Sequence, residues 1–316
     1  MLLRIPPTSR RLALIGLACL GTQSVLVPQS IGNAKEQSVL EQADDASGET
    51  YSLKHSLQPG QTLRYEVTHV AKTKTRINGS EEIANVHTKS NRAWTVAEAD
   101  DSEMTFDHSI ESVAMTQQSG DADEVQWDST TGEEPPKIFS VVASQIGTPL
   151  ATVTINKQGQ EVRREDHAGS KSSLGMGTLA LALPDKPVKI GESWAVPSEI
   201  QARTEDGFVK QIKIRQLYTL KKVKAGVATL SVKSETLTPI EEESLRAQVI
   251  QQLSNGTLRF DVDNGYLLSK ELIWDESVVG FQGPGSMMEY RAKMTEELLP
   301  EDSSTSVASK KKKSQR

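Results

Sequence analysis

The chain has very little cysteine and few aromatic residues. Its 316 residues include one cysteine, Cys19, and the aromatic share is 4%. If residues 1–34 are removed on export, the mature protein has no cysteine, which excludes disulfides, thiolate catalysis and cysteine-ligated metals. So low an aromatic content argues against a stacking platform for single-stranded nucleic acid.

The N-terminal apolar run, residues 12–20, is also far shorter than the roughly 20 residues needed to span a bilayer. It follows a basic stretch and precedes a small-residue site at residues 31–34. This order predicts a cleavable signal peptide over residues 1–34, and hence a protein of the periplasm, cell envelope or extracellular space with no transmembrane segment after signal removal. An uncleaved anchor is the alternative. The basic residues are Arg4, Arg10 and Arg11.

Two details of this segment leave alternatives open. The Arg10-Arg11 pair resembles a twin-arginine signal, although paired arginines also occur in ordinary signals. Cys19 resembles the cysteine of a lipoprotein box, but Gly16 stands where that box has leucine. We therefore interpret Cys19 as an apolar filler, with lipidation as the alternative.

Acidic residues dominate the body of the chain. Apart from the three N-terminal arginines and five basic residues at the C-terminus, 28 lysines and arginines face 42 acids. An acidic body repels phosphate backbones, so no nucleic-acid partner is expected. The five C-terminal bases could contact an anionic surface; a solubilising end is the alternative. They are Lys310, Lys311, Lys312, Lys313 and Arg316.

The sequence carries no recognisable motif for catalysis, a cofactor or a metal, so no residue is assigned to such a site and no cofactor is expected. Glu165, Asp166 and His167 could form an acid–base cluster, but a solvated hairpin arm is the preferred interpretation. Residues 261–265 resemble a calcium loop, yet Leu272 stands where position twelve requires an acid, so we predict a turn.

Alternating apolar residues predict two long β-hairpins. In the first, Asn78-Gly79 forms a two-residue turn, which sets paired residue numbers to a sum of 157 and places Leu63 opposite Trp94. The same register puts His69 and His87 on opposite faces, so they cannot share a metal and are expected to be solvated. In the second, the loop 205–207 sets the sum at 412 and places Trp194 opposite Tyr218.

The two hairpins look like copies. Five segments correspond in the same order: 59–63 with 190–194, 78–79 with 206–207, 93–96 with 217–220, 103–106 with 227–230, and 125–128 with 258–261. The alternative is that any β-meander yields such matches.

Each half also has a candidate short helix. Pro135-Pro136 precedes Ile138, Val141 and Val142 in the first, and Pro239 opens the second. We predict a mainly β fold of antiparallel curved sheets or an open barrel in two related halves. The expected organisation is 1–34 signal peptide, 35–50 linker, 51–168 first β repeat, 169–187 crossover, 188–299 second β repeat and 300–316 disordered basic tail.

Three segments resemble an uncharacterised family of secreted β-rich bacterial proteins of unknown function. They are P-G-x-T-L-R-Y at residues 59–65, G-E-S-W at 191–194 and F-D-x-D-x-G-x-L at 260–267. The resemblance implies export and a β-rich fold, and it lends no catalytic residues.

These observations rank three functions. The first is an exported, non-enzymatic envelope or periplasmic protein that binds a lipid or other hydrophobic ligand between curved sheets. The second is a structural or interaction protein of the cell envelope. The third is a hydrolase whose site follows no motif.

Overall fold

A computed structural model describes residues 48–167, 180–204 and 206–300. The strands are β1 (Thr62–Ile77), β2 (Ser80–Ala99), β3 (Glu103–Ser119), β4 (Val125–Asp128), β5 (Pro149–Asn156), β6 (Glu161–Asp166), β7 (Ser193–Arg203), β8 (Val209–Lys224), β9 (Val227–Thr236), β10 (Asn255–Asp261), β11 (Tyr266–Val279) and β12 (Met287–Leu298). The helices are α1 (Ser140–Ala143) and α2 (Glu243–Val249), with 3-10 turns η1 (Lys137–Phe139) and η2 (Ile250–Gln252).

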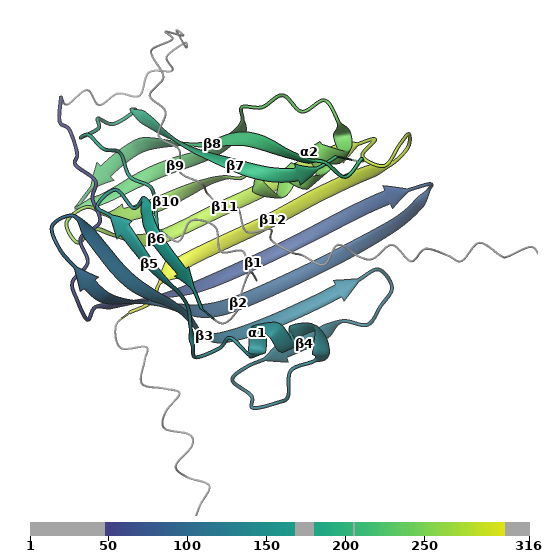
Figure 1. Cartoon of the computed structure of the whole chain (residues 1–316), viewed down its shortest axis with the longest axis horizontal. Helices are drawn as coiled ribbons and strands as arrows, with labels where there is room; N and C mark the ends of the chain where they lie inside the picture. The colour runs from purple at the N-terminus through teal and green to yellow at the C-terminus, as the bar shows by residue number, and fades with distance from the viewer. Residues whose placement is uncertain (1–47, 168–179, 205, 301–316) are drawn as a thin grey trace, which may run out of the picture.

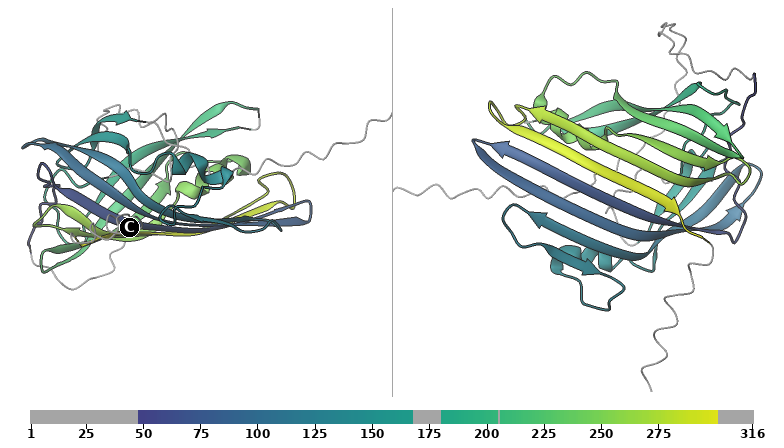
Figure 2. Two further views of the ribbon diagram at one scale, coloured as in Figure 1. Left: turned by 90° about the horizontal axis from the view of Figure 1, so that it is seen from below. Right: turned by 180° about the vertical axis from the view of Figure 1, so that it is seen from behind.

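The strands form one antiparallel sheet that does not close into a barrel. Their order is β6-β5-β3-β2-β1-β12-β11-β10-β9-β8-β7, with β4 paired to β3. The two edges of the sheet curl toward the same side, and both helices lie on that concave side (Figures 1 and 2). The prediction of a mainly antiparallel β fold is confirmed, and both halves of the chain share one sheet.

The two faces of the sheet have opposite chemistry, as period-two alternation requires. On the convex face, charged side chains pair across neighbouring strands, as in Lys89–Glu66 and Lys293–Glu271, and Arg64 of β1 pairs with Glu111 of β3 across the intervening β2. These pairs are exposed, so each adds little stability and mainly keeps the face solvated. The concave face carries the apolar core.

The main core fills the curled end of the sheet, where strands of both halves meet. The segment preceding β1 crosses this end and joins the halves. The His55 N–H donates to the Lys157 carbonyl oxygen, and the Ser56 N–H donates to that of Gly265. Leu53 and Leu57 are buried on either side of these bonds. The segment thus connects the β5–β6 turn to the β10–β11 turn through hydrogen bonds.

Both predicted hairpin registers are confirmed. Leu63 pairs with Trp94 along β1 and β2, and every residue pair of that ladder sums to 157. Trp194 pairs with Tyr218 along β7 and β8, where every pair sums to 412. The turns have the predicted conformations, since Asn78, Gly79 and Gly207 have positive φ angles of 50°, 80° and 85°. Local turn chemistry therefore set both registers.

The fifth pair of segments in the proposed duplication lies on strands with different neighbours along the chain. It matched β4 with β10, but β4 lies before α1 in the chain, whereas β10 lies after α2. The strand that follows α1 and ends in a glycine turn is β5. Nonetheless, β4 pairs with β3 and β10 pairs with β9, the two strands that hold the fourth pair of segments, so the duplication stays a prediction.

The helices differ from prediction in detail. Ile138 and Val141, expected on the apolar side, are each 57% exposed, while Phe139 and Val142 are buried. The second helix begins at Glu243, after an N-cap at Glu242, rather than at Pro239. Within the described residues, no helix combines the length and apolarity needed to cross a membrane.

Candidate functional site

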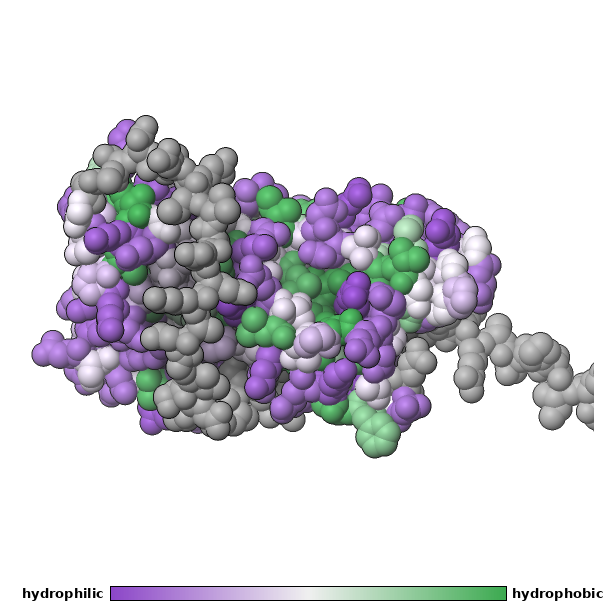
Figure 3. Space-filling view, turned by 90° about the horizontal axis from the view of Figure 1, so that it is seen from above, coloured by the Kyte–Doolittle hydropathy of each residue, from purple (hydrophilic) through white to green (hydrophobic). Residues whose placement is uncertain are grey.

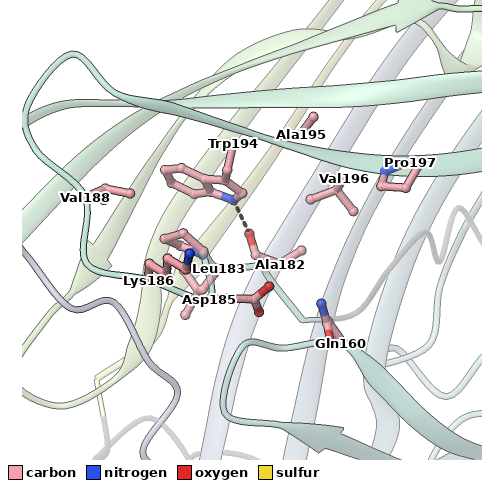
Figure 4. Close-up of a pocket in the computed structure, with 11 residues that line it drawn as sticks. Gln160, Ala182, Leu183, Asp185, Lys186, Val188, Trp194, Ala195, Val196 and Pro197 are labelled. Carbon is pink, nitrogen blue, oxygen red and sulfur yellow. Dashed lines mark hydrogen bonds between the residues drawn. The ribbon is translucent and has the colours of Figure 1, made fainter. Parts of the chain in front are cut away.

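A pocket lies on the concave side, between the start of β7 and the segment that leads into it. Its volume is about 340 Å³. One wall is formed by residues 182–186 and Val188 and the other by residues 194–197, and Gln160 from the β5–β6 turn borders the pocket (Figure 4). Most of the lining is apolar. The space-filling view from above shows apolar side chains gathered among hydrophilic ones over the middle of the molecule (Figure 3).

Trp194 is held in a fixed orientation beside the pocket. Its indole Nε1–H donates to the Ala182 carbonyl oxygen at 3.0 Å, and its ring stacks on Tyr218 with centroids 5.6 Å apart. The Tyr218 hydroxyl donates to the Gln216 side chain, and burial raises the pKa of this hydroxyl. Trp194 therefore offers a preorganised apolar surface, because its polar atom already has a partner.

A glycine sets the distance between the pocket wall and the β5–β6 turn. Gly159 has φ +75°, and a Cβ built there would lie 2.1 Å from the Leu181 carbonyl oxygen. The Leu183 N–H donates to the Gln158 carbonyl oxygen at 2.7 Å. Only glycine allows this approach, which holds the wall of residues 181–183 in place.

Three polar side chains surround the mouth of the pocket. Asp185, Lys186 and Gln160 are all exposed. The Gln160 Oε1 accepts a hydrogen bond from Asn156 Nδ2 at 2.8 Å, which leaves its amide N–H groups directed elsewhere. The pocket thus combines apolar walls with a few polar groups at its mouth, the usual composition of a small-ligand site.

The histidines do not form a metal site within the described residues. His69 pairs with Thr88 and Val70 with His87, so His69 and His87 point to opposite faces as predicted. His87 is exposed, but the expectation that His69 is solvated is wrong. His69 is partly buried against Trp274, with ring centroids 6.2 Å apart, and burial lowers its pKa. Among the described residues, no group of three or more metal-ligating side chains occurs.

The charged run of β6 splits between the two faces of the sheet. Asp166 binds Arg164 at 2.7 Å, whereas His167 contacts Thr152 through Nε2 at 2.8 Å. The Thr152 hydroxyl in turn donates to Asp107 at 2.6 Å. Sequence reasoning missed this group, because its three residues come from β3, β5 and the end of β6.

The order of that group does not match a nucleophile triad, in which the histidine stands between the hydroxyl and the carboxylate. Here the hydroxyl stands in the middle, and its one proton goes to Asp107. His167 Nε2–H then donates to the same oxygen. The chain of hydrogen bonds joins the strands and activates no nucleophile.

The predicted turn at residues 261–265 is confirmed. The Asp261 carboxylate accepts hydrogen bonds from the backbone N–H groups of Asp263 and Asn264. The predicted signal segment with Cys19 and the basic residues of the C-terminus, Lys310, Lys311, Lys312, Lys313 and Arg316, lie outside the described residues.

The fold and pocket define a one-sheet β protein with a ligand-sized pocket at its edge. A model for a family of unknown function (DUF6263) matches residues 172–267. That range includes the G-E-S-W and F-D-x-D-x-G-x-L segments and leaves out the segment at residues 59–65. It covers less than half of the chain. No curated protein matches the sequence.

Among solved structures, one similar chain comes from a study of lipid–protein interactions in lipovitellin. The alignment covers 78% of the present chain and 26% of the lipovitellin chain, at 12% identity with a TM-score of 0.41. The protein therefore spans about a quarter of that chain. At this TM-score the likeness carries no argument about function.

Proposed function

We propose that this protein is an exported, non-enzymatic binding protein that holds a hydrophobic ligand in the pocket beside β7. The observation that carries the proposal is the fixed indole of Trp194 on an otherwise apolar wall. A volume of about 340 Å³ falls within the usual range for small-molecule sites, roughly 300–1,000 Å³. The apolar part of the ligand packs on Trp194, Val196 and Leu183, and its polar part faces the mouth.

Binding is tested with two probes, dodecanoate and 8-anilinonaphthalene-1-sulfonate, by calorimetry and fluorescence titration. Native mass spectrometry of the freshly purified protein shows in parallel whether a ligand copurifies. Val196→Phe adds a ring inside the pocket, and Val70→Phe adds the same atoms on the exposed convex face of β1. We expect Val196→Phe to weaken binding at least about tenfold and Val70→Phe to leave it unchanged. Equal binding by both variants would place the site elsewhere.

Export is the second part of the proposal and rests on the N-terminal segment. Expression of the full chain in a bacterium, followed by fractionation and intact mass measurement, tests it. A periplasmic or secreted product that begins near residue 35 supports export. A cytoplasmic product that retains residues 1–34 contradicts it.

Contact of the basic C-terminus with an anionic surface is also a proposal. Cosedimentation with vesicles containing anionic lipid compares the full chain with a version ending at Ser309. Each lysine or arginine near such a surface contributes about 1 kcal/mol, so the longer form should bind markedly more strongly. Equal binding would contradict the contact.

A further inference from the structure

Within the described part of the chain, β7 is the last strand of the sheet, so one of its two edges has no neighbouring strand there. Alternate residues of a strand direct their backbone N–H and C=O groups to opposite edges, so odd- or even-numbered residues face the free edge. Beyond the end of β7, the Thr204 N–H donates to the Phe208 carbonyl oxygen, which belongs to the ladder with β8. The Arg203 N–H points the other way and donates to Gln248 Oε1 at 2.9 Å. Even-numbered residues therefore bond to β8, and odd-numbered residues present N–H and C=O groups to the free edge.

The sequence blocks this edge in two places. Gln248 of α2 binds both backbone groups of Arg203, since its Nε2 donates to the Arg203 carbonyl oxygen at 2.7 Å. Pro197, also at an odd position, has no N–H to offer. Proline and side-chain caps are common protections of edge strands against further pairing. Between the start of β7 and Pro197, the described residues give the edge groups of Ser193 and Ala195 no such protection.

One unprotected stretch of the edge coincides with the pocket, whereas Glu199, which has an equivalent edge N–H, lies beyond it. Ala195 itself borders the pocket, between Trp194 and Val196, whose side chains point to the concave side (Figure 4). A ligand seated here covers both the apolar wall and the Ala195 N–H and C=O. An acyl chain has no hydrogen-bonding groups and would leave both backbone groups without a partner, which is unfavourable. An extended peptide would satisfy both, because one residue of an added strand exchanges two hydrogen bonds with its partner.

We propose that the occupant of this pocket is a short extended segment of another polypeptide, which pairs with Ala195 and places an apolar side chain against Trp194. The inference rests on the proposed function and names its ligand class. Pro197 ends the pairing, so the segment recognised is only a few residues long. On the far side, Gln160 borders the same pocket, and because its Oε1 is already bonded to Asn156, its amide N–H groups are suited to bind a backbone carbonyl.

The test uses a fluorescein-labelled, end-blocked peptide of five residues, threonine alternating with leucine, and fluorescence anisotropy as the readout. A second peptide has the same side chains with N-methylated central amides. Ala195→Pro removes the edge N–H inside the pocket without touching the ladder to β8. Glu199→Pro is the matched control, because it removes an equivalent edge N–H beyond the pocket.

We expect Ala195→Pro to weaken binding of the first peptide about fivefold to tenfold, and Glu199→Pro to leave it within about twofold. The N-methylated peptide should bind the native protein as weakly as the first peptide binds Ala195→Pro. Both variants should keep the native unfolding midpoint, since neither position donates to β8. Equal peptide affinity for Ala195→Pro and Glu199→Pro would overturn the edge pairing.

The dodecanoate titration separates this inference from the function on which it rests. If dodecanoate binds and Val196→Phe abolishes that binding while the peptide fails to bind, the pocket is a site for an acyl ligand and the peptide inference falls alone. If neither probe binds and no ligand copurifies, both proposals fall.

Discussion

The two long hairpins of this protein begin with the same local structure and end in different environments. Where the first hairpin begins, the Gly60 N–H donates to the Val96 carbonyl oxygen, and the Val96 N–H donates to that of Gln61. Where the second begins, the Gly191 N–H donates to the Leu220 carbonyl oxygen, and the Leu220 N–H donates to that of Glu192. A side-chain bond repeats as well, from the Gln58 N–H to Gln61 and from the Lys189 N–H to Glu192.

The aromatic residues that follow show the difference. Trp94 is 4% exposed and stacks on Phe106 in the main core, with centroids 4.7 Å apart. Trp194, from the second hairpin, is only partly buried and borders the pocket. The first hairpin lies in the middle of the sheet, because β12 pairs with the other edge of β1. The second hairpin lies at the edge of the sheet, because β7 is its last described strand. In the proposed duplication Trp94 matches Tyr218, which is also buried, and Trp194 matches Leu63, which is 6% exposed. The position of Trp194 is therefore part of the core in the first hairpin and borders the pocket in the second.

The largest expected effect contrasts these two tryptophans. Trp94→Ala should lower the free energy of unfolding by about 3–5 kcal/mol, since it leaves a large buried cavity. Trp194→Ala should cost roughly half as much, because its ring is partly exposed already. Urea unfolding followed by circular dichroism measures both. Equal losses would show that the second hairpin is as much a part of the core as the first.

The next largest loss of stability is expected at the glycines of the β5–β6 and β10–β11 turns. Gly159→Ala and Gly265→Ala should each cost roughly 3 kcal/mol, because φ is positive and the new Cβ meets backbone atoms at 2.1 Å and 2.4 Å. Thermal unfolding of the two variants measures the loss. A loss below about 1 kcal/mol would mean that Leu181 does not approach the first turn so closely, or that Ser56 does not approach the second.

Lowering the pH should reduce the free energy of unfolding because of buried His108, which lies on β3 opposite Trp94. Burial lowers its pKa from 6.5 to about 3, with Arg92 and Arg164 adding to the shift. Between those values the unfolded chain binds a proton that the folded chain does not. Stability attributable to this residue is therefore complete above about pH 6.5 and falls by about 1.4 kcal/mol per pH unit below it.

His108→Leu should reduce by one the number of protons that the chain takes up on unfolding, and so lower the slope of the free energy of unfolding with pH. Denaturant unfolding at several pH values from 7 to 4 measures this slope. At neutral pH the variant should be at least as stable as the native protein, because neither ring nitrogen of His108 has a hydrogen-bond partner among the described residues. Buried His55 remains as an internal reference, since its pKa is lowered in the same direction. An unchanged slope in the variant would contradict this account.

The smallest effect is expected at the glycines where the two hairpins begin. Gly60 and Gly191 have φ of +82° and +89°, and a Cβ at either would meet no atom within 4 Å. Replacement by alanine should cost only the backbone strain, about 1 kcal/mol at each position. Thermal unfolding should show equal shifts. Unequal shifts would show that the starts of the two hairpins differ in a way their hydrogen bonds do not reveal.

Local patterns predicted much of the fold and little of the site. The registers of β1–β2 and β7–β8 followed from the alternation of apolar residues and from Asn78, Gly79 and Gly207. The solvation of His69 was misjudged because Trp274, its ring partner, lies on β11, two strands away in the sheet. The pocket was missed for the same reason. Trp194 suggested only a strand residue until Ala182 and Gln160 were placed beside it.

Turn geometry and side-chain alternation act over a few residues, so the amino-acid sequence alone was enough to predict which residues pair within each hairpin. It could not predict that β12 covers the edge of β1, or that no strand in the described part of the chain covers the edge of β7. A strand presents the same backbone groups on both edges, whatever its side chains are. Which edge is paired therefore depends on contacts between segments far apart in the chain, and that choice left the pocket beside Trp194 open.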